Sequence, residues 1–446
     1  MFLQIPVPGV VRSVFVSPAE LAFVLILLPL TAFFGLCALY LWRLLLAAMA
    51  VRKRLYTVPP SEMTGGPVSP LPRFVLLIPA HNEELLLGAA LDSLQQLDYP
   101  RDACTIVVIA DNCTDQTARI AREHGAIALE RFDTEKIGKG YALEWALHFL
   151  LNPADNSVST AVLHAFDAVV ILDADTQVSP NLLAAFARGL QAGEQVMQAH
   201  YDVLNVHESW RTRLMACALA LAHVVKPLGR ERLGLSDGLK GNGMCFSRAV
   251  VQSVPWSGES ITEDIEYTLR LCRAGYRVAF LPEARVQAQM PATGAQAVSQ
   301  RKRWEGGRYR LLFTVVPDLL REGLRRRSRI LCDRAMELII PPFAEMFAVP
   351  LALLAICLAV AGTCRWPWAW GLTWAWAVIL ALQAGYLIAG LWVARVPAQV
   401  AFSLLYAPAY IVWKLGVYLV MALTRSAGGW KRTERHQLSN NPSSRS

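Results

Sequence analysis

The sequence predicts an α/β fold with a doubly wound parallel sheet, flanked at both ends of the chain by segments long enough to cross a membrane. Two observations carry this prediction. Between residues 73 and 192, short runs rich in Val, Ile and Leu alternate with amphipathic stretches of helical period. This alternation is typical of parallel strands joined by right-handed helical crossovers. The hydrophobic share of 54% is high for a soluble protein, and the excess lies near the two termini.

The sheet is expected to centre on residues 168–172, Ala-Val-Val-Ile-Leu. Five apolar residues in a row indicate a strand that is buried on both faces. Asp173 and Asp175 follow directly, and ligand sites in open α/β sheets lie beyond the carboxyl ends of the strands. Two carboxylates at that place can bind a divalent cation of the kind that a diphosphate leaving group needs. A polar turn without a ligand is the alternative, because Asp is common in turns.

The first expected membrane segment covers residues 18–42, in which Glu20 is the only charge. This length is enough to cross a hydrocarbon core of roughly 30 Å. No basic region precedes it and no small-residue cleavage site follows it, so a membrane span is expected rather than a signal peptide. The basic cluster at residues 52–54 then places the next part of the chain in the cytoplasm by the positive-inside rule.

Three apolar segments near the C-terminus, 338–362, 368–394 and 401–423, are each long enough to span. Several tryptophans around the second segment are typical of a membrane–water interface. Three crossings would leave the tail outside, whereas the basic residues between 425 and 435 favour the cytoplasm. The alternative is that 401–423, which contains Pro408 and Lys414, enters the membrane without crossing it.

A linker rich in Pro, Gly and Ser over residues 51–72 precedes the sheet. The other expected strands are 74–79, 105–110 and 126–129. The expected helices are 83–96, about 114–123, 139–151 and 179–192. Polar side chains follow the first two strands, with Asn82 and Glu83 after one and Asp111 after the other. These positions are where a parallel sheet binds its ligand.

The second half of the chain is less regular. Residues 208–225 form an amphipathic helical pattern, and Gly241-Asn242-Gly243 is a loop to which a ligand backbone could come close. Thr262 is expected to cap a helix at about 263–273 that has Glu263 and Asp264 in its first turn. Acids are favoured at helix starts by the helix dipole alone, so a purely structural role for this pair stays open.

Residues 300–334 carry eleven Arg or Lys against four acids, which is nearly all of the net charge of +8. Apolar pairs alternate with this charge, so we expect an amphipathic segment that lies on anionic lipid head groups. No nucleic-acid partner is expected, because a membrane segment follows at once. The nine cysteines show no metal-binding or disulfide spacing, which fits free thiols in a reducing cytoplasm.

Six short motifs then occur in a fixed order. They are Pro79-Ala-His-Asn82-Glu83, Ala110-Asp111-Asn112, Gly138-Lys139-Gly140, Asp173-Ala-Asp175, Thr262-Glu263-Asp264 and Gln300-Arg-Lys-Arg303-Trp304. With them the chain resembles the membrane-bound, inverting glycosyltransferases of family two, and looks closest to the cellulose, chitin-oligosaccharide, hyaluronan and poly-N-acetylglucosamine synthases. The resemblance covers about residues 73–310. It implies a nucleotide-sugar-binding domain of the glycosyltransferase A type. In one departure, Asn112 replaces the second Asp or Gly that is commoner in the family.

The resemblance implies a site for a UDP-sugar and a Mg²⁺ or Mn²⁺ ion. Asp175 is the expected metal ligand, and Asp173 shares the contacts to the metal and the nucleotide. The donor-binding residues that it implies are Pro79, Asn82, Glu83, Asp111, Lys139, Asp173, Gln300, Arg303 and Trp304. Lys139 offers a cation to phosphate between two glycines; without the resemblance it would be a solvent-facing Lys at a helix start.

Inversion in a single displacement needs one carboxylate to take the proton of the acceptor hydroxyl. The resemblance assigns this role to Asp264, with Glu263 as its hydrogen-bonding neighbour. Trp304 is implied as an aromatic platform for an acceptor sugar, and ordinary interface packing is its alternative. The expected product is an extracellular polysaccharide or oligosaccharide. Transfer to a membrane lipid is the close alternative, since ceramide glucosyltransferases carry a similar Gln-x-x-Arg-Trp ending.

The expected organisation places a cytoplasmic catalytic domain on the inner (plasma) membrane. The segments are a membrane segment at 1–50, the linker at 51–72, the catalytic domain at 73–299, the basic interface segment at 300–337, membrane segments at 338–424 and a polar tail at 425–446. With four membrane segments, a translocation channel would need export partner subunits. A transporter or assembly scaffold is the alternative from another functional class, and release of nucleotide from a UDP-sugar would exclude it.

Overall fold

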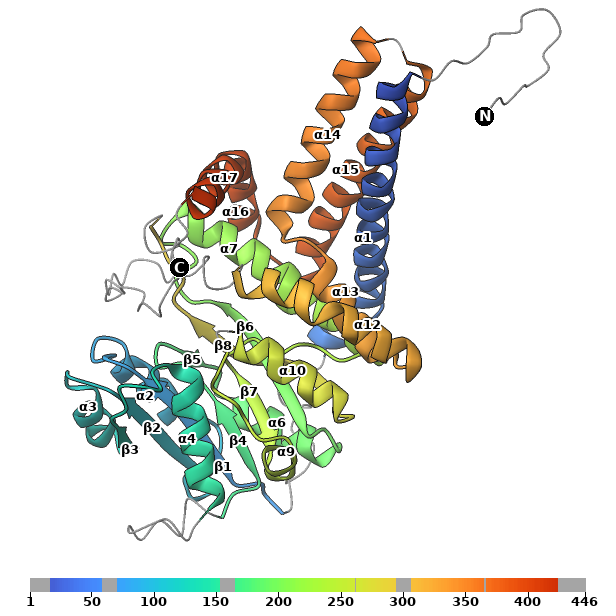
Figure 1. The fold of residues 1–446 in the computed structure, drawn as a ribbon. Coiled ribbons are helices and arrows are strands. Elements are labelled where there is room, and N and C mark those ends of the chain that lie inside the picture. Colours follow the sequence, from blue (N-terminus) through green and yellow to red (C-terminus); the bar gives the residue numbers. More distant parts are fainter. Residues whose placement is uncertain are drawn as a thin grey trace, which may run out of the picture. The chain divides into compact units, whose positions relative to one another are not determined.

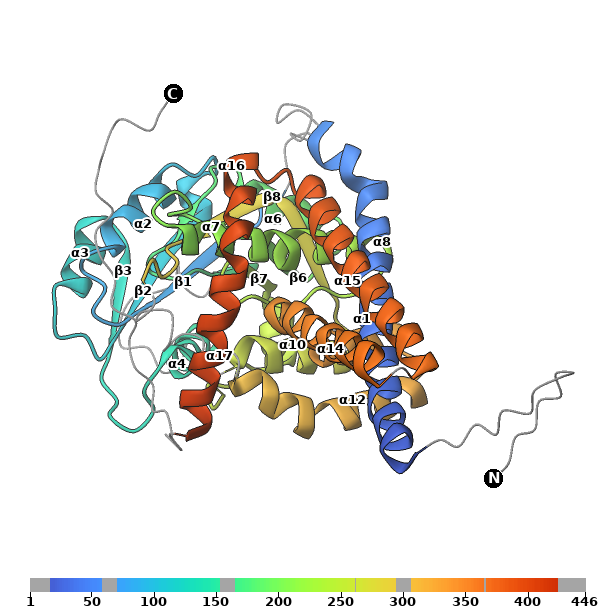
Figure 2. The same cartoon turned by 90° about the horizontal axis from the view of Figure 1, so that it is seen from above.

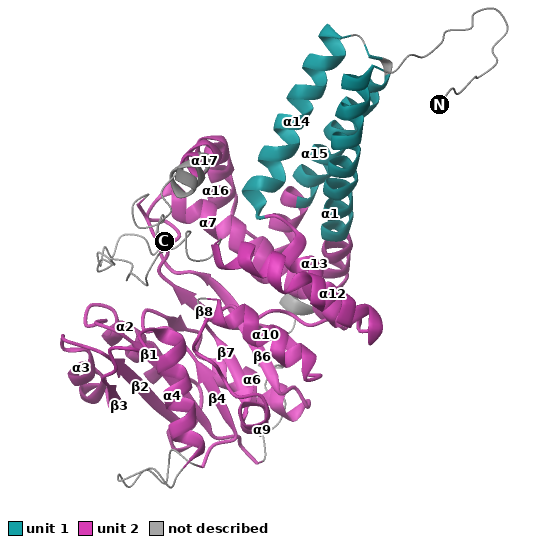
Figure 3. Cartoon of the chain, in the orientation of Figure 1, with its two compact units in different colours: residues 1–42, 342–386 teal, residues 43–341, 387–446 magenta. Residues whose placement is uncertain are grey.

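The computed structural model describes residues 17–57, 70–152, 165–260, 262–293, 306–364 and 366–423. Its chain divides into two compact units (Figure 3). Unit 1 holds residues 1–42 and 342–386, and unit 2 holds residues 43–341 and 387–446. The sheet and all the expected catalytic positions belong to unit 2.

Unit 2 contains an eight-stranded sheet with the order β3-β2-β1-β4-β7-β6-β8-β5 (Figure 1). The strands are β1 (Phe74–Ala80), β2 (Cys104–Asp111), β3 (Ile127–Arg131), β4 (Ala168–Ile171), β5 (Gln177–Val178), β6 (Val196–Val203), β7 (Met244–Ser247) and β8 (Val278–Ala288). The first four are parallel to one another, with Phe74 opposite both Cys104 and Ala168. The four strands expected from the apolar runs are therefore confirmed.

Two apolar cores cover the two faces of this sheet, because side chains alternate along each strand. Phe74, Leu76 and Ile78 lie in the core that includes helices α2 (Leu87–Gln95), α3 (Thr117–Glu123) and α6 (Leu182–Gln191). Val75 and Leu77 lie in the other core, with α4 (Lys139–Leu151), α9 (Arg248–Ser253) and α10 (Glu263–Arg273). Helices on both faces confirm the doubly wound α/β fold.

The sheet is mixed, so the expectation of an entirely parallel sheet is wrong for its second half. Strand β7 is antiparallel to both β4 and β6, and β5 is antiparallel to β8. The chain re-enters the sheet at the carboxyl end of β4, where the Gly243 N–H donates to the Ile171 carbonyl at 3.0 Å. A strand that starts from that edge has to run back along β4.

The expected amphipathic helix at 208–225 is three consecutive pieces. These are α7 (Trp210–Ala220), a π-helical turn over Leu221–Val225 and α8 (Lys226–Arg232). Ser209 caps α7, since its side chain accepts from the Thr212 N–H at 3.2 Å.

The basic segment forms α12 (Val316–Arg325) and α13 (Arg329–Ile339). Both helices contribute to an apolar cluster with Leu269 and Cys272 of α10. On α13, Asp333 and Arg334 are only 5% and 4% exposed. Arg334 was expected on a lipid-facing surface, and the structure buries it against acidic partners instead.

Unit 1 is helical. It contains the first part of α1 (Pro18–Thr57), α14 (Phe343–Thr363) and most of α15 (Pro367–Val393). Within the unit, Trp42 Nε1 donates to the Leu382 carbonyl at 2.8 Å, and the rings of Phe34 and Trp376 make an edge contact at 5.9 Å. These contacts join α1 to α15.

In the part of the chain that the structure describes, three helices are long and apolar enough to cross a membrane: Pro18–Arg52, Phe343–Thr363 and Trp368–Val393. One N-terminal and two C-terminal spans are thereby confirmed. The third apolar segment instead forms α16 (Ala398–Ala401), a 3₁₀ turn over Phe402–Tyr406 and α17 (Ala407–Leu423). All nine cysteines are free thiols.

Candidate active site

The polar loops after β1 and β2 are fastened to each other. Asn82 has a positive φ of 54°, and its side-chain oxygen accepts from the Thr114 N–H at 2.8 Å. The Glu83 N–H donates to the Thr117 hydroxyl at 2.8 Å. Pro79 lies within β1, opposite Ile109. The loop expected to bind the donor is therefore tied to the loop that follows β2, the neighbour of β1 in the sheet (Figure 2).

Asp111, at the end of β2, is almost completely buried. One carboxylate oxygen contacts Arg131 at 2.6 Å, and Arg131 also contacts Asp133 at 2.8 Å. The Asp111 carbonyl forms a hydrogen bond with His81 Nδ1 at 2.7 Å. Arg131 carries no motif signal, and the sequence analysis missed it. Its contact fixes the direction of the Asp111 carboxylate.

Lys139 is the first residue of α4, after Gly138 with its positive φ of 124°. Its ammonium donates to Asp173 Oδ1 and to the Gly241 carbonyl, both at 2.5 Å. The Lys139 and Asp173 side chains are 27% and 29% exposed. Residues from three separate segments thus meet at the carboxyl edge of the sheet, where two of their side chains are partly exposed.

The turn after β4 is held by Asn242. The Asn242 side-chain oxygen accepts from the Asp173 N–H at 3.2 Å, and its amide donates to the Thr176 hydroxyl at 2.8 Å. Asn242 is completely buried, and Asp175 is 5% exposed. Asp173 therefore faces Lys139 while Asp175 lies deeper. The two expected carboxylates are on one turn but have different surroundings.

Asp264 lies beside the same loop. A side chain at Gly241 would place its Cβ 3.6 Å from Asp264 Oδ2 and 4.0 Å from Lys139 Nζ. Such distances leave room for a Cβ, and it is the positive φ of 78° at Gly241 that favours glycine here. The Asp264 carboxylate and the Lys139 ammonium therefore approach one point of the loop from two helices.

Electrostatics distinguish the two groups. Burial works against the charge of Lys139, but the carboxylates of Asp173, Glu263 and Asp264 outweigh it and raise the pKa of this ammonium. Burial raises the pKa of Asp264, and the Ile265 N–H and nearby lysines offset this only in part. Lys139 is therefore a permanent cation, and Asp264 is a stronger base than an ordinary aspartate.

Thr262 directly precedes α10, but its side chain does not cap the helix. Instead, the Thr262 N–H donates to the Ser260 hydroxyl at 3.1 Å, and that hydroxyl donates to Glu266 at 2.6 Å. The role expected for Thr262 as a side-chain cap is therefore wrong. The positions of Glu263 and Asp264 are set by this local network and by α10.

No group of three or more His, Cys, Asp or Glu side chains that could hold a metal ion occurs among the described residues. Asp173 and Asp175 can supply one or two carboxylate oxygens. A magnesium-type ion commonly takes one or two carboxylates and completes its shell with substrate phosphates and water. The residues present fit a cation that is bound jointly with a diphosphate.

Gln300, Arg303 and Trp304 lie outside the described residues. The chain is described again from residue 306, beside the start of α10. Gly307 packs so closely on Thr262 that an added Cβ would come within 2.2 Å of its methyl group. Arg310 contacts Glu266 at 2.7 Å. The residues that directly follow the last motif therefore return to the helix that carries Asp264.

Comparison with known proteins gives a family and several relatives. Residues 72–307 match the family described as glycosyltransferase like family 2. A probable glycosyltransferase of Bacillus subtilis is 26% identical over 273 residues, which are 59% of this chain and 61% of that protein. A beta-monoglucosyldiacylglycerol synthase of Synechocystis is 27% identical over 274 residues, or 60% of this chain and 54% of that protein.

Among solved structures, a mannosyltransferase from Pyrobaculum calidifontis in complex with GDP-Man and Mn²⁺ has a TM-score of 0.44. It is 20% identical in sequence and covers 80% of this chain and 97% of that chain. This chain spans little more than half the length of the curated relatives described above.

Proposed function

This chain belongs to glycosyltransferase family 2, and from that premise we propose that it transfers a sugar from a UDP-sugar to a hydroxyl of a membrane lipid, with inversion. The observation that carries the proposal is the meeting of Asp264, Lys139 and Asp173 around Gly241 at the carboxyl edge of the sheet. A base, a cation for phosphate and a metal-binding carboxylate are the groups that this reaction needs.

The donor is bound along the edge above β1, β2 and β4. Asp111 accepts a hydrogen bond from the base, and its contact with Arg131 fixes the direction of its carboxylate. Pro79, Asn82 and Glu83 form the wall beside the nucleoside. Lys139 contacts the diphosphate, and its raised pKa keeps it charged there.

Asp175 and Asp173 would hold a divalent cation, Mg²⁺ or Mn²⁺. When bound, the cation supplies Lewis-acid stabilisation of the departing diphosphate. The chain's own contribution is to orient the two carboxylates through Asn242 and Thr176. When the phosphate binds, the Lys139 ammonium can donate to both the phosphate and Asp173. Its contact with Asp173 therefore weakens without being lost.

In the transfer step, the acceptor oxygen attacks the anomeric carbon from the face opposite the diphosphate. The new C–O bond forms as the bond to the diphosphate oxygen breaks, and UDP leaves with the electron pair. The acceptor proton passes to Asp264, whose raised pKa makes it a better base than an ordinary aspartate. Glu263 supports the charge of Lys139 from the same helix turn.

A lipid acceptor is supported by what surrounds α10. The helix that carries Asp264 packs on α12 and α13, and α13 ends four residues before the membrane span that starts at Phe343. The relative in Synechocystis is a glycolipid synthase. We place the site on the cytoplasmic side of the inner membrane, because Arg52, Lys53 and Arg54 follow the first span.

A growing glycan is the second candidate acceptor. The resemblance of the six motifs together to polysaccharide synthases favours it, whereas Gln300-x-x-Arg303-Trp304 alone is compatible with either acceptor. Arg303 would contact the diphosphate, and Trp304 would stack on the acceptor sugar. In that case the product is a polysaccharide, and export partner subunits complete its path across the membrane. The Trp304→Ala variant would then make shorter products, while a lipid transferase would make one product in a smaller amount.

The test uses the full chain in lipid nanodiscs with Mg²⁺ or Mn²⁺. Release of UDP is measured for a panel of UDP-sugars, with and without diacylglycerol, and the product is sized by mass spectrometry. We expect release with at least one UDP-sugar, dependence on the lipid, and one product of fixed size. A ladder of products without added lipid would replace the lipid acceptor with a glycan. No release with any donor would reject the enzyme and leave the scaffold alternative.

A further inference from the structure

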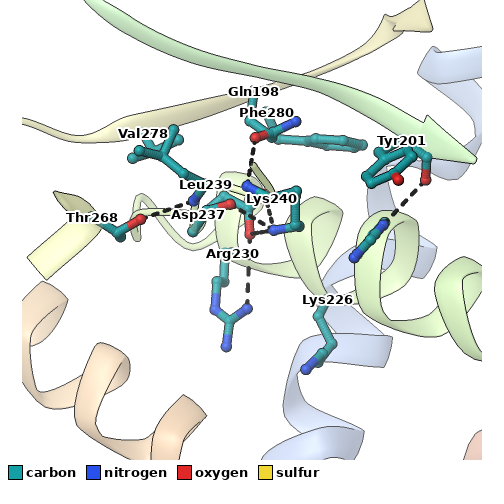
Figure 4. Close-up of polar contacts among 12 residues, drawn as sticks. Gln198, Tyr201, Lys226, Arg230, Asp237, Leu239, Lys240, Thr268, Val278 and Phe280 are labelled. Carbon is teal, nitrogen blue, oxygen red and sulfur yellow. Dashed lines mark hydrogen bonds and ion pairs between the residues drawn. The ribbon is translucent and has the colours of Figure 1, made fainter. Parts of the chain in front are cut away.

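A second group of charged side chains lies behind the loop that carries Gly241. We call it the buried charge cluster, and Figure 4 shows part of it. It consists of Lys226 and Arg230 on α8, Asp237 and Lys240 on the loop that follows, and Asp333, Arg334 and Glu337 on α13. Its members come from segments about a hundred residues apart in the chain.

The contacts within the cluster form a continuous chain. Arg230 contacts Asp333 at 2.8 Å and Glu337 at 2.5 Å, and lies 4.0 Å from Asp237. Lys240 contacts Asp237 at 2.9 Å and donates to the Gly238 carbonyl at 2.6 Å. Arg230 is therefore the link between α13 and the loop.

The cluster contains more cations than carboxylates. Burial would raise the pKa of Glu337, but Arg230 and Lys226 outweigh it and hold this pKa well below its ordinary value. Burial lowers the pKa of Lys226 to about 8, and Glu337 only partly opposes this. Neighbouring cations thus lower the pKa of Glu337, whereas burial is the main cause of the lowered pKa of Lys226.

The loop from Asp237 to Gly243 separates this cluster from the active site. The Lys240 side chain points into the cluster, and the Lys240 N–H donates to the side-chain oxygen of Gln198 at 2.9 Å (Figure 4). The next residue, Gly241, gives its carbonyl to Lys139 at 2.5 Å. Asn242 then holds the Asp173 turn. One side of the loop anchors it, and the other side contacts two groups of the site, Lys139 and Asp173.

We propose that Asp237 and Lys240 are positioning residues for sugar transfer: their ion pair holds the Gly241 carbonyl and Asn242 in register with Lys139 and Asp173, and Arg230 fastens that pair to α13. This inference rests on the proposed function. It assigns a role in the reaction to residues that contact neither donor nor acceptor. It also makes the helix that leads into the Phe343–Thr363 span part of the support of the site.

The structure provides a matched control for the test. Lys226 belongs to the same cluster and contacts Glu337 at 2.5 Å, but it does not belong to the loop. Replacing either lysine by Met removes one buried cation at similar cost to the fold. Of the two lysines Lys226 and Lys240, it is Lys240 that helps Lys139 to lower the pKa of the Asp264 carboxylate.

The variants Lys240→Met, Lys240→Arg and Lys226→Met are compared in the full chain in nanodiscs, by thermal midpoint, kcat, donor KM and the pH profile of kcat/KM. We expect Lys240→Met to raise the donor KM about tenfold, the effect of one lost charge-assisted contact. It should also move the acid limb of the profile to higher pH. Lys240→Arg should restore both values, and Lys226→Met should change only the thermal midpoint.

If Lys240→Met and Lys226→Met lower the thermal midpoint equally and leave KM and the acid limb unchanged, the cluster is only structural and the proposal fails. Should Lys240→Met not fold, Asp237→Asn replaces it. That variant should raise KM as well, but it leaves Lys240 without its counter-charge, so the acid limb must not move to higher pH. A shift to higher pH, or an unchanged KM, would overturn the proposal.

Failure of the proposed function is distinguishable from failure of this inference. If no UDP-sugar is turned over, the affinity for UDP still reports the position of Lys139. Calorimetric titration of UDP into the same variants should show weaker binding for Lys240→Met and normal binding for Lys226→Met. Equal affinities would reject the positioning role whatever reaction the chain catalyses.

Discussion

Two groups of charges lie on opposite sides of one loop, and they differ in exposure and in sign. In the active site, Lys139 and Asp173 are 27% and 29% exposed. In the buried charge cluster, Arg230 and Asp333 are 2% and 4% exposed. The exposed pair can exchange partners with a ligand, so its contacts are available for binding. The buried pair has no such freedom, and its contacts hold the loop in place.

The candidate active site and the buried charge cluster also differ in the sign of their local charge. The pKa of Lys139 is raised by three carboxylates, despite its burial. The pKa of Lys226 is lowered by burial and by neighbouring cations, despite Glu337. Without a ligand, the site is thus rich in negative charge and the cluster is rich in positive charge. A diphosphate is therefore repelled from the site unless a cation accompanies it.

The largest expected effect comes from removing an ion pair in the buried charge cluster. Arg230→Met removes the buried side chain that pairs with Asp333 and Glu337, and breaking a buried pair costs about 3–5 kcal/mol. The thermal midpoint of the purified chain should fall by many degrees. Arg119→Met is the control, because its pair with Glu123 is exposed and such pairs contribute little. Equal midpoints for the two variants would contradict the account of the cluster.

The next effect concerns Asp264 in the candidate active site. Asp264→Asn should lower kcat by at least about a hundredfold, the lower range for a general base, with nearly normal donor binding. The free energy of unfolding of the Asp264→Asn variant should rise, whereas its kcat falls. The folded chain raises the pKa of Asp264, so the ionised group destabilises the fold at neutral pH, and Asn removes that cost. Turnover within a few-fold of wild type would leave Asp264 a structural residue at a helix start.

A third effect tests the negative field of the site. Asp173 and Asp175 fit a cation that shares its shell with a diphosphate, so Mn²⁺ should bind weakly to the chain alone and much more tightly when UDP is present. Electron paramagnetic resonance of Mn²⁺ measures both. Asp175→Ala should abolish the increase. If the affinity for UDP is the same with and without EDTA in the wild type, the metal assignment is wrong.

The sequence predicted the half of the sheet whose strands are continuous apolar runs. It missed β5 to β8. Strands β5 and β7 have only two and four residues, and polar residues such as Gln198, Asp202 and Gln287 interrupt the apolar pattern of β6 and β8. Antiparallel pairing of β7 depends on where the chain re-enters the sheet, and no local signal contains that information.

For the site, sequence motifs named Lys139, Asp173 and Asp264 but gave no distances between them. The structure brings these residues together around Gly241. The buried charge cluster was not foreseen. Charged residues on an amphipathic helix are normally solvent-exposed, and Arg230 and Asp333 are 103 residues apart in the chain. Pairing over such a separation is a property of the fold alone.

The smallest expected effect sharpens the difference between the two lysines through the pH dependence of stability. Below about pH 8, Lys226 is charged in both the folded and the unfolded chain, so its titration adds no slope. Between its folded pKa of about 8 and its ordinary pKa of 10.5, the folded chain binds fewer protons than the unfolded chain. The contribution of Lys226 to the free energy of unfolding therefore rises with pH across that window.

Thermal midpoints of wild type and Lys226→Met, measured from pH 7 to pH 10, should differ in slope, with wild type gaining stability relative to the variant as the pH rises. Lys139 has a raised pKa, so its contribution is present throughout that range, and Lys139→Met should leave the slope unchanged. Parallel curves for wild type and Lys226→Met would show that the folded chain does not lower the pKa of Lys226.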